Sequence, residues 1–473
     1  MKSRAYLLFL ISLFYSISSF TQELDKKRVI DKLPEIENYV RNEMEKRRIP
    51  GLVYGIFDRD SLLAIEAFGK ADIQNNGPVV PETIFELASL TKQFTASAIL
   101  LLQQDGKLNI DDLLKTHFPQ CPEAWSSITL KHLLTHTSGL TASDDYAGIN
   151  EMTGKRVRTE FADWSKQFII DAIVAQELSH APGEVYQYGD PAYALLGIVI
   201  DNITGSYRKF MKERIFDPAG MSSTYIVDQR TIHPNEARGY TLRDGEWINN
   251  RRYHNIEIPS WYGIFSNIQD LQKWDAALNS DKILSTSSKK LLWDNYKTND
   301  GTNINYGLGW NITKLGGLKI ADHTGITGTH YLKVLEKNVS VITLTNLGYA
   351  GWDSVQPTGI ANGIASIIGI NIKIDADYVT NNGLHVIPWS KEKRENIIGN
   401  YTLSADWGEG PVSIFEENGK VHISSMGLQF ELGLLENGNV IYFDLEFEEI
   451  LVPDTSGNMI SVNGKDVYTK SKN

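Results

Sequence analysis

Two patterns of apolar positions in the first part of this chain indicate a helix and a pair of strands. Residues 23–48 are polar overall. Within them, apolar side chains recur at the three- and four-residue spacing of a helix, at Ile30, Leu33, Ile36 and Val40. Two apolar runs follow at 52–57 and 62–68, separated by the polar tetrapeptide 58–61. The pattern therefore predicts a helix and then a β-hairpin.

The centre of the chain has mostly helical patterns, and strand patterns return after it. Residues 85–278 have helical periodicity broken by loops that contain Pro and Gly. Strand-like runs reappear at 318–321, 331–335 and 339–345, and residues 359–368 have the pattern of a packed helix. Strands on both sides of a helical insertion predict an α+β domain, with one sheet completed by both ends of the domain.

From about residue 387 the pattern changes to short alternating strands. Segments 412–415, 420–424, 439–445 and 459–462 alternate apolar and polar residues, and turns containing Gly or Asn lie between them. We expect residues 387–473 to form a small all-β domain, either a barrel or a curved sheet.

The first 21 residues have the features of an export signal. Lys2 and Arg4 precede the apolar stretch 5–15, and small residues follow it. The stretch is too short for a stable membrane span, so we expect cleavage near residues 20–22. The alternative is an uncleaved membrane anchor. The expected organisation is a signal peptide at 1–21, a main domain at 22–386 and the β domain at 387–473, exported to a bacterial periplasm or secreted.

Composition narrows the classes of partner. The chain has 473 residues, 42% of them hydrophobic, which is enough material for a large core. Loss of Lys2 and Arg4 with the signal would lower the formal net charge from −12 to −14. Such an acidic protein is a poor candidate for binding nucleic acid or an anionic membrane. Cys121 is the only cysteine, so no internal disulfide forms, and we interpret it as a passive small apolar residue.

The tetrapeptide Ser89-Leu90-Thr91-Lys92 carries the first candidate chemistry. It precedes the apolar run 94–102, which is rich in the strong helix formers Ala and Leu. Ser89 and Lys92 therefore share a helix face at the end where backbone N–H groups lack partners. A lysine one turn away can activate a serine if burial and nearby cations lower the lysine pKa. By itself the pattern is weak, and a coincidental surface pair is the alternative.

Two further motifs lie downstream. In the segment 182–190, Tyr188 could relay the nucleophile's proton as a phenolate if a neighbouring lysine lowered its pKa. The alternative is a core tyrosine. In the segment 322–326, Gly325 would let a substrate backbone approach a strand edge, where a free N–H can hold an oxyanion. The alternative is a strand that ends in a turn.

Together and in this order, the motifs resemble the serine beta-lactamase and penicillin-binding-protein-like superfamily. The nearest branch is that of the class C beta-lactamase-related hydrolases, with their esterases and D-amino-acid peptidases. Further landmarks that carry the resemblance are segments 132–140, 220–224, 263–274 and 306–310. The resemblance covers residues 49–370. It implies the beta-lactamase/transpeptidase-like fold, an antiparallel sheet flanked by helices with a helical subdomain.

The resemblance also implies residue roles. Ser89 would be the acylated nucleophile, Lys92 its proton partner, and Tyr188 an assistant in acylation and deacylation. The backbone N–H groups of Ser89 and Ile326 would form the oxyanion hole. The tripeptide His323-Thr324-Gly325 would line the opposite wall and contact the substrate's carboxylate or carbonyl. No metal or organic cofactor is implied.

Two departures from the family pattern concern the substrate. The tyrosine motif usually ends in asparagine, but here it ends in Asp190. An ionised aspartate cannot donate to a substrate carbonyl, although it can bind Lys92, favour its protonated form and shift the base role toward Tyr188. His323 stands where true beta-lactamases usually carry lysine, and a neutral histidine attracts a carboxylate less. Both changes argue against efficient lactam hydrolysis.

A metal site is the rival interpretation of one landmark. His132 and His136 have the spacing of zinc ligands on a helix. Leu133, however, occupies the place of the general-base glutamate, and no third ligand is evident. We therefore expect no metal.

The sequence leads to two functional hypotheses. The first is an exported serine hydrolase that forms an acyl-enzyme on Ser89. Its substrates would be D-amino-acid peptides, small esters or beta-lactam-like amides. The alternative is a penicillin-binding or sensor protein that keeps the fold without turnover. The sequence does not specify the oligomeric state.

Overall fold

The structure is a computed structural model. It describes residues 26–140, 164–228, 230–243, 246–250, 255–315, 317–348, 359–370, 372, 386–405, 408–417, 419–425, 428–443, 448–461 and 467–471. The predicted signal peptide at 1–21 lies outside these residues. Among the described residues, every helix is too short or too polar to cross a membrane.

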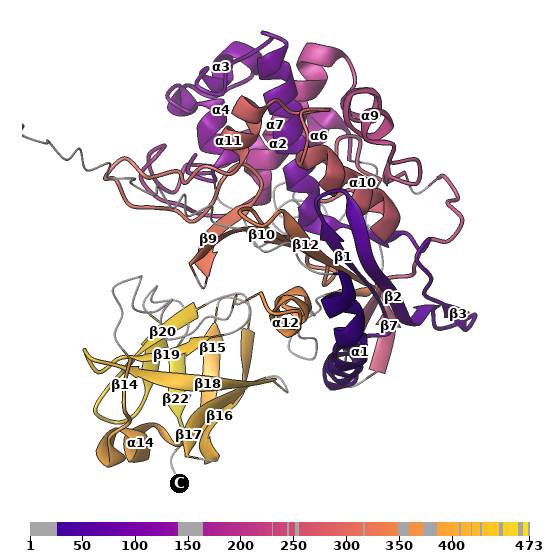
Figure 1. The fold of residues 1–473 in the computed structure, drawn as a ribbon. Helices are drawn as coiled ribbons and strands as arrows, with labels where there is room; N and C mark the ends of the chain where they lie inside the picture. Colours follow the sequence, from indigo (N-terminus) through magenta and orange to yellow (C-terminus); the bar gives the residue numbers. More distant parts are fainter. Residues whose placement is uncertain are drawn as a thin grey trace, which may run out of the picture.

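A seven-stranded antiparallel sheet forms the centre of the main domain (Figure 1). Its order is β3-β2-β1-β12-β11-β10-β9. The strands are β1 (Gly51–Asp58), β2 (Ser61–Asp72), β3 (Gly77–Pro78), β9 (Asn311–Leu315), β10 (Leu318–Thr324), β11 (His330–Val334) and β12 (Val339–Thr345). β1 pairs with β12 from Leu52↔Thr345 to Asp58↔Val339. This pairing joins the two ends of the domain and confirms the α+β sheet expected from the sequence.

Helices cover both faces of this sheet and form a separate lobe above it (Figure 1). α1 (Lys26–Arg47) and α12 (Ile360–Ile367) pack together on one face, and α10 (Ile268–Leu278) packs on the other. The lobe contains α2 (Thr91–Gln104), α3 (Leu114–His117), α4 (Leu130–Leu134), α6 (Lys166–Val174), α7 (Asp190–Thr204), α8 (Tyr207–Met211), α9 (Asp217–Ala219) and α11 (Thr286–Leu292). Short helical turns are η1 (Ala88–Leu90), η2 (Glu123–Trp125) and the π-type turn η4 (Lys212–Phe216).

Two small three-stranded sheets accompany the central sheet. One has the order β4-β8-β5 and contains β4 (Phe85–Glu86), β5 (Tyr225–Ile226) and β8 (Ile264–Ser266). The other has the order β13-β6-β7 and contains β6 (Tyr240–Arg243), β7 (Glu246–Asn249) and β13 (Leu347–Gly348). The β4 strand leads directly into η1, so the small sheet fixes the point from which α2 begins.

The C-terminal region is an all-β domain, as the sequence predicted. Its nine-stranded sheet has the order β14-β18-β17-β16-β15-β22-β21-β20-β19, and an additional β18–β19 pairing closes it into a barrel. The elements are β14 (Val386–Ile387), α14 (Lys391–Ile397), β15 (Gly399–Ala405), β16 (Gly408–Glu417), β17 (Lys420–Ser425), β18 (Leu428–Leu435), β19 (Val440–Phe443), β20 (Glu448–Pro453), β21 (Met459–Ser461) and β22 (Val467–Lys470). The barrel has its own apolar core, which includes Tyr401, Val421 and Leu451.

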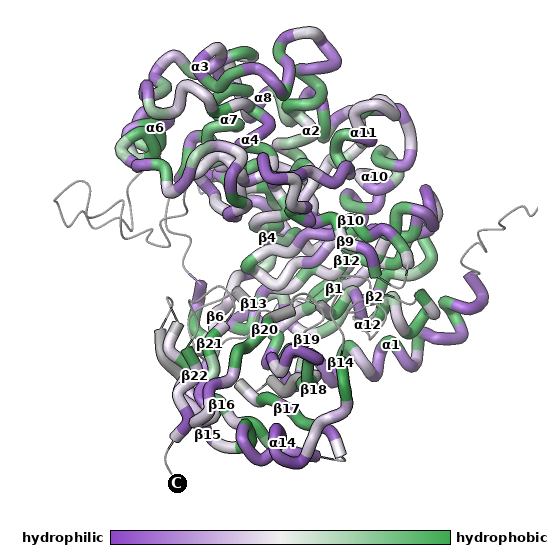
Figure 2. Tube along the Cα trace, turned by 90° about the vertical axis from the view of Figure 1, so that its left-hand side faces the viewer, coloured by the Kyte–Doolittle hydropathy of each residue, from purple (hydrophilic) through white to green (hydrophobic). Residues whose placement is uncertain are grey.

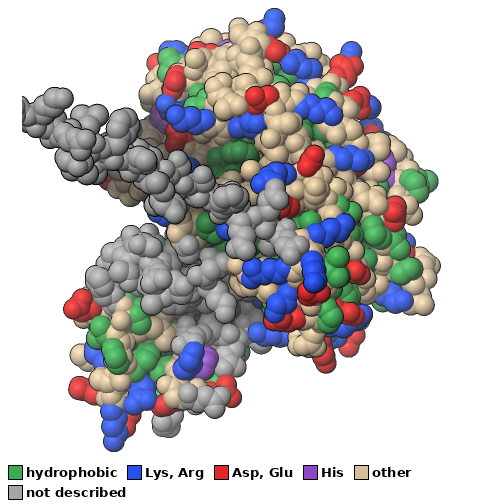
Figure 3. Space-filling model, in the orientation of Figure 1, with side chains coloured by type: hydrophobic (Ala, Val, Ile, Leu, Met, Phe, Trp, Pro, Cys, Tyr) green, Lys and Arg blue, Asp and Glu red, His purple; other side chains and the backbone are tan. Residues whose placement is uncertain are grey.

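The main domain contains two apolar cores, one on each side of the central sheet. The larger core joins α2, α7 and α10 to the inner face of β12, and the smaller one lies between the sheet and the α1–α12 pair. In Figure 2 the hydrophobic segments accordingly lie in α2, α7 and the central strands, while polar segments lie at the periphery of the molecule. On the face shown in Figure 3, acidic and basic side chains are interspersed.

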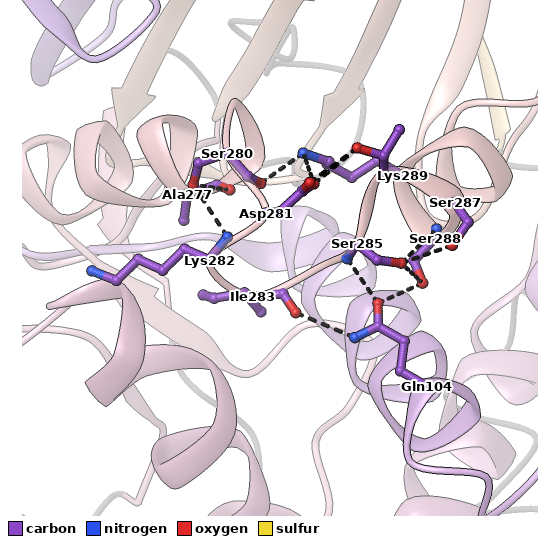
Figure 4. Close-up of polar contacts among 11 residues, drawn as sticks. Gln104, Ala277, Ser280, Asp281, Lys282, Ile283, Ser285, Ser287, Ser288 and Lys289 are labelled. Atoms are coloured by element: carbon purple, nitrogen blue, oxygen red, sulfur yellow. Dashed lines mark hydrogen bonds and ion pairs between the residues drawn. The ribbon is translucent and has the colours of Figure 1, made fainter.

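Helix α2 is fixed to the rest of the domain at both ends. At its start, the Ile264 backbone N–H donates to the Thr91 hydroxyl over 3.0 Å. At its end, the Gln104 amide contacts the connection between α10 and α11, as Figure 4 shows. Its Oε1 accepts from the Ser285 N–H at 2.8 Å and from the Ser288 hydroxyl at 2.6 Å. Anchors at both ends set the axial position of the helix.

A buried ionic cluster holds α10 against the sheet. The Asp275 carboxylate lies 2.9 Å from the Lys333 ammonium and also accepts from the hydroxyls of Tyr331 and Ser340. All four residues are buried. A buried charge is tolerated only when it is paired and hydrogen-bonded, so Asp275 and Lys333 depend on each other.

We predict that Asp275→Asn lowers the free energy of unfolding of the main domain by about 3–5 kcal/mol, because it leaves the Lys333 charge buried without its partner. The double variant Asp275→Asn/Lys333→Met is expected to recover part of this loss, since both charges are then gone. Urea unfolding followed by tryptophan fluorescence measures both values, with Lys333→Met completing the cycle. A double variant as unstable as Asp275→Asn would contradict the mutual dependence.

Candidate active site

Ser89 lies in the turn η1, immediately before α2, where it is half-buried. The preceding residue, Ala88, has a φ of 47°, in the left-handed region that non-glycine residues rarely occupy. The strained residue directs the chain from β4 into the helix. Ser89 therefore stands in the first turn of a continuous helical stretch, where backbone N–H groups have no acceptor within the helix.

Lys92 is fully buried, and its ammonium group has three hydrogen-bond acceptors around it. Its Nζ donates to Ser89 Oγ at 3.1 Å, to Asp190 Oδ1 at 2.7 Å and to the Trp261 carbonyl at 3.2 Å. A protonated lysine has three N–H donors, and this arrangement uses all of them. The surroundings of Lys92 are thus built for its charged form.

The pKa of Lys92 agrees with this hydrogen bonding, because it favours the charged form. Burial alone lowers it, but the Asp190 carboxylate and then Tyr188 more than offset burial, so the pKa of Lys92 is raised above its ordinary value. The sequence argument required burial and nearby cations to lower this pKa, and that condition is not met. The physical reason is the acid that replaces the usual asparagine.

Tyr188 completes the group around the nucleophile. Its ring centroid lies 4.8 Å from Lys92 Nζ, and the side chain is 37% exposed. Burial of its hydroxyl raises the pKa of Tyr188; Lys92, and a hydrogen bond to Ser89, act in the opposite direction without cancelling burial. The expectation of a lowered tyrosine pKa was therefore wrong, since burial outweighs the lysine. At neutral pH Tyr188 is a phenol.

Asp190 is the first residue of α7, whose N-terminus points into the same region as that of α2. Its side chain is 33% exposed while Lys92 is not exposed at all. The ion pair between them therefore links two helices through a buried cation and a partly accessible anion. The sequence analysis expected this ion pair, because Asp190 stands where the family usually carries asparagine.

His323 lies at the end of β10 and is buried, with 4% of its surface exposed. Its Nδ1 lies 2.8 Å from the Thr324 carbonyl, which can only accept, so Nδ1 carries the proton. Its Nε2 then accepts from the Tyr306 hydroxyl at 3.2 Å. Burial, followed by repulsion from Lys92, lowers the pKa of His323 to about 4. The ring is neutral and both of its nitrogens are engaged.

The loop after β10 is held next to the nucleophile. The Thr327 hydroxyl donates to the Glu86 carbonyl at 2.9 Å, and the Thr329 hydroxyl donates to the Leu87 carbonyl at 3.0 Å. A Cβ on Gly325 would come within 2.6 Å of the Leu87 carbonyl oxygen. Gly325 thus permits close packing of protein on protein, whereas the sequence argument had assigned its freedom to substrate approach. Ile326 follows, with its side chain 50% exposed.

The structure brings the predicted site residues together from distant parts of the chain. Hydrogen bonds and a ring contact join Ser89, Lys92, Asp190 and Tyr188, and the His323 ring lies 5.9 Å from that of Tyr188. The threonine contacts bring segment 324–326 to the residues before Ser89. Their roles stay predictions from the resemblance. Sequence reasoning missed Thr327, Thr329 and Tyr306, because a threonine in a turn and a tyrosine in a landmark carry no chemical signal of their own.

His132 and His136 do not share a helix face, because α4 ends at Leu134 and His136 has a φ of 54°. The Nδ1 of His132 accepts from the Thr129 N–H, and the Nδ1 of His136 accepts from the Gly189 N–H. Within the described part of the chain, no group of three metal-ligating side chains comes together.

Comparisons with known proteins agree with this geometry. The protein-family model described as Beta-lactamase matches residues 36–361. A penicillin-binding protein of Bacillus subtilis is 30% identical over 330 residues, which cover 64% of this chain and 69% of that protein. Protein flp of Staphylococcus aureus is 30% identical over 250 residues, covering 52% of this chain and about half (48%) of that protein.

Two solved structures share the fold. The octameric penicillin-binding protein homologue from Pyrococcus abyssi has a TM-score of 0.63 and 20% identity, covering 92% of this chain and 100% of that one. D-amino acid amidase from Ochrobactrum anthropi has a TM-score of 0.59 and 22% identity, covering 74% of this chain and 99% of that one. The first match is long enough to include much of the C-terminal barrel.

The buried, neutral state of His323 predicts a specific pH dependence of stability. Its pKa is about 4 in the folded protein, against about 6.5 in an unfolded chain. Below pH 6.5 the unfolded chain binds a proton that the native ring, facing Lys92 and His330, does not. The free energy of unfolding should therefore fall by roughly 3 kcal/mol between pH 6.5 and pH 4 through this residue alone.

Urea unfolding of the natural protein and of His323→Gln at pH 7, 5.5 and 4 checks this prediction. Glutamine keeps a donor and an acceptor but cannot titrate, so the stability difference between the two proteins should change by about that amount across the range. Parallel stability profiles would show that His323 is not held neutral.

Proposed function

Because the chain belongs to the beta-lactamase family, we propose that it is a serine hydrolase that forms an acyl-enzyme on Ser89 and releases it to water. The observation that carries this proposal is the chain of contacts from Ser89 Oγ to Lys92 Nζ at 3.1 Å and from Lys92 Nζ to Asp190 Oδ1 at 2.7 Å. It connects a hydroxyl at a helix N-terminus to a carboxylate through one amine, which is a route for the proton that the hydroxyl must lose.

A proton count of the site assigns the acceptor. Lys92 already carries three protons and Tyr188 already carries one, because the pKa of each is raised. Among these partners, only a carboxylate at Asp190 has lone pairs that can accept a further proton. We assign the terminal base to Asp190. The sequence left the base role open between Lys92 and Tyr188, with Asp190 shifting it toward Tyr188; in the present proposal Tyr188 acts as a hydrogen-bonding phenol.

Acylation then runs as a balanced transfer. One Nζ proton of Lys92 first passes to Asp190 Oδ1, which leaves Nζ with a lone pair. The Ser89 hydroxyl proton then passes to Nζ, while the Oγ lone pair forms a bond to the substrate carbonyl carbon. The carbonyl π electrons move to its oxygen. The backbone N–H groups of Ser89 and Ile326 are proposed to bind this oxyanion, supported by the α2 N-terminus. Collapse expels the alcohol or amine, which takes back one proton. Water repeats the sequence to release the acid.

The charges facing the cleft indicate the substrate class. Lys92 is fully buried and His323 is neutral, so neither presents a positive charge to a substrate carboxylate. The Asp190 carboxylate is partly exposed, and exposed apolar side chains lie on the same loops, at Val185 and Ile326. We propose neutral esters and amides, and D-amino-acid amides or peptides with a free ammonium group, as substrates. Carboxylate-bearing beta-lactams are expected to be poor ones. The family match and the amidase fold neighbour support this range.

Export is part of the proposal. It rests on the charge, length and small residues of segment 1–21. Expression in a bacterium followed by N-terminal sequencing of the mature protein tests it, with cleavage near residues 20–22 as the expected result.

We predict that Ser89→Ala abolishes hydrolysis of a nitrophenyl ester and labelling by a fluorophosphonate, since the bond-forming oxygen is removed. Ser97→Ala is the matched control: Ser97 lies on the same helix, and its hydroxyl donates to the Gln93 carbonyl of that helix. Mass spectrometry of the intact protein detects the adduct. Ester turnover that survives in Ser89→Ala would exclude the assignment.

A second candidate function is an acyl-binding sensor without turnover. One observation favours it: the raised pKa values of Lys92 and Tyr188 leave both residues protonated, which is unfavourable for activating water. Release of a fluorescent penicillin or of the ester acyl group separates the two functions. Release within the assay time indicates a hydrolase, and a persistent adduct indicates a sensor.

We predict that Asp190→Asn lowers kcat/KM at pH 7 by about 100-fold, the usual contribution of a general base. The remaining activity should rise with pH, because only Lys92 or Tyr188 can then accept the proton, and both have higher pKa values than a carboxylate. A pH profile of ester hydrolysis, with Asp171→Asn on the exposed face of α6 as control, measures the shift. An unshifted profile would return the base role to Lys92 or Tyr188.

A further inference from the structure

His136 takes part neither in the proposed proton route nor in a metal site, yet its ring is surrounded by the rings of Tyr188, Tyr193 and Tyr306. It is 2% exposed. Its ring centroid lies 4.4 Å from that of Tyr188, 4.9 Å from that of Tyr306 and 5.0 Å from that of Tyr193. A polar ring placed among three tyrosines requires a reason beyond packing.

His136 makes hydrogen bonds to the residues on both sides of Tyr188. Its backbone carbonyl accepts from the Gln187 N–H at 2.9 Å. Its ring Nδ1 accepts from the Gly189 N–H at 3.2 Å. These are the residues directly before and after Tyr188. His136 therefore fixes the backbone before Tyr188 through its own carbonyl and the backbone after it through its ring, and the ring also packs against that of Tyr188.

The hydrogen bond from Gly189 to His136 also fixes the start of α7. Gly189 is the N-cap of this helix and has no side chain that could cap it. Its backbone N–H is held by His136, and the next residue is Asp190, the partner of Lys92. A shift of Gly189 would thus move Tyr188 and Asp190 together. The neighbouring Gly183 N–H donates to the Thr137 carbonyl at 2.7 Å, so the whole loop is docked on segment 136–137.

Two features of His136 are energetically unfavourable. His136 has a left-handed φ of 54°, a conformation that costs a non-glycine residue energy. Its Nε2 is buried with no hydrogen-bond partner among the described residues. Since Nδ1 accepts a hydrogen bond, the ring must be neutral. Burial, and then repulsion from Lys92, lowers the pKa of His136 well below its usual value.

We propose that His136 is a positioning residue that holds Tyr188 and Asp190 in register with Ser89, and that its working atom is Nδ1. The inference rests on the proposed function, because it assigns no reaction step to His136 itself. An error of about 1 Å in the placement of reacting groups can cost roughly 100-fold in rate. We therefore expect loss of the Nδ1 hydrogen bond to lower kcat and to leave KM nearly unchanged.

Two substitutions separate the acceptor from the ring. His136→Phe keeps a planar ring but removes Nδ1. His136→Asn removes the ring but keeps an acceptor, because Asn Oδ1 and His Nδ1 are both bonded to Cγ. Asparagine also tolerates the left-handed conformation better than most residues. We expect kcat for ester hydrolysis to fall about 100-fold in His136→Phe with KM within about threefold, and His136→Asn to regain at least about tenfold.

His132→Phe is the matched control, because His132 also accepts a backbone N–H through Nδ1 but lies on α4, away from the tyrosine loop. Thermal unfolding of all variants and the rate of fluorophosphonate labelling of Ser89 are measured alongside kcat and KM. A natural kcat in His136→Phe overturns the inference, as does an equal loss in the Phe and Asn variants that follows a shared loss of thermal stability. If His136→Phe does not fold, a kcat of His136→Asn more than about 20-fold below the natural value overturns it, and a smaller loss supports it.

Ser89→Ala in the same assay distinguishes failure of the positioning role from failure of the proposed function. An inactive Ser89→Ala with an unaffected His136→Phe overturns the positioning role alone. An active Ser89→Ala overturns the proposed function and, with it, this inference.

Discussion

The ion pair between Lys92 and Asp190 is the constraint on which the arrangement of the site depends. A fully buried ammonium must have a counter-charge and acceptors for its protons. Asp190 supplies the charge from the first turn of α7, while Ser89 and the Trp261 carbonyl supply the other acceptors. Satisfying Lys92 therefore forces the N-termini of two helices to the same point. Both helix ends favour negative charge there, which suits an oxyanion and a carboxylate alike.

The central sheet turns this local requirement into a fixed geometry. β1 and β12 join the two ends of the domain, and the β10–β11 loop reaches the residues before Ser89 through the hydroxyls of Thr327 and Thr329. Gly309, with a φ of 77°, lies so close to α2 that a Cβ there would come within 2.7 Å of the Lys92 carbonyl oxygen. The helix, the loop and the tyrosine segment are thus positioned by backbone contacts that side-chain patterns in the sequence do not reveal.

The sequence was informative where periodicity or reactive residue types carry the signal. It predicted the hairpin, the two-ended sheet, the helix after Ser89 and the C-terminal β domain, because each has a repeating apolar pattern. It also singled out Ser89, Lys92, Tyr188, Asp190 and His323. It was wrong about the pKa of Lys92 and of Tyr188, since the balance between burial and a neighbouring carboxylate depends on distances. It gave His136 no role beyond that of a landmark or a metal ligand, because its contacts are with backbone groups 50 residues away.

The two departures from the family pattern have a common physical consequence. Replacing asparagine by Asp190 adds a negative charge beside Lys92, and replacing lysine by His323 removes a positive charge from the facing strand. Relative to the family pattern, each residue lowers the formal charge around Ser89 by one, because Asp190 pairs with Lys92 and His323 is neutral. In the proposed mechanism, the same carboxylate that weakens the attraction for an acidic substrate is also the base, a role that an amide could not take. Asp190 therefore couples the charge of the site to the proposed proton route, whereas His323 changes the charge alone.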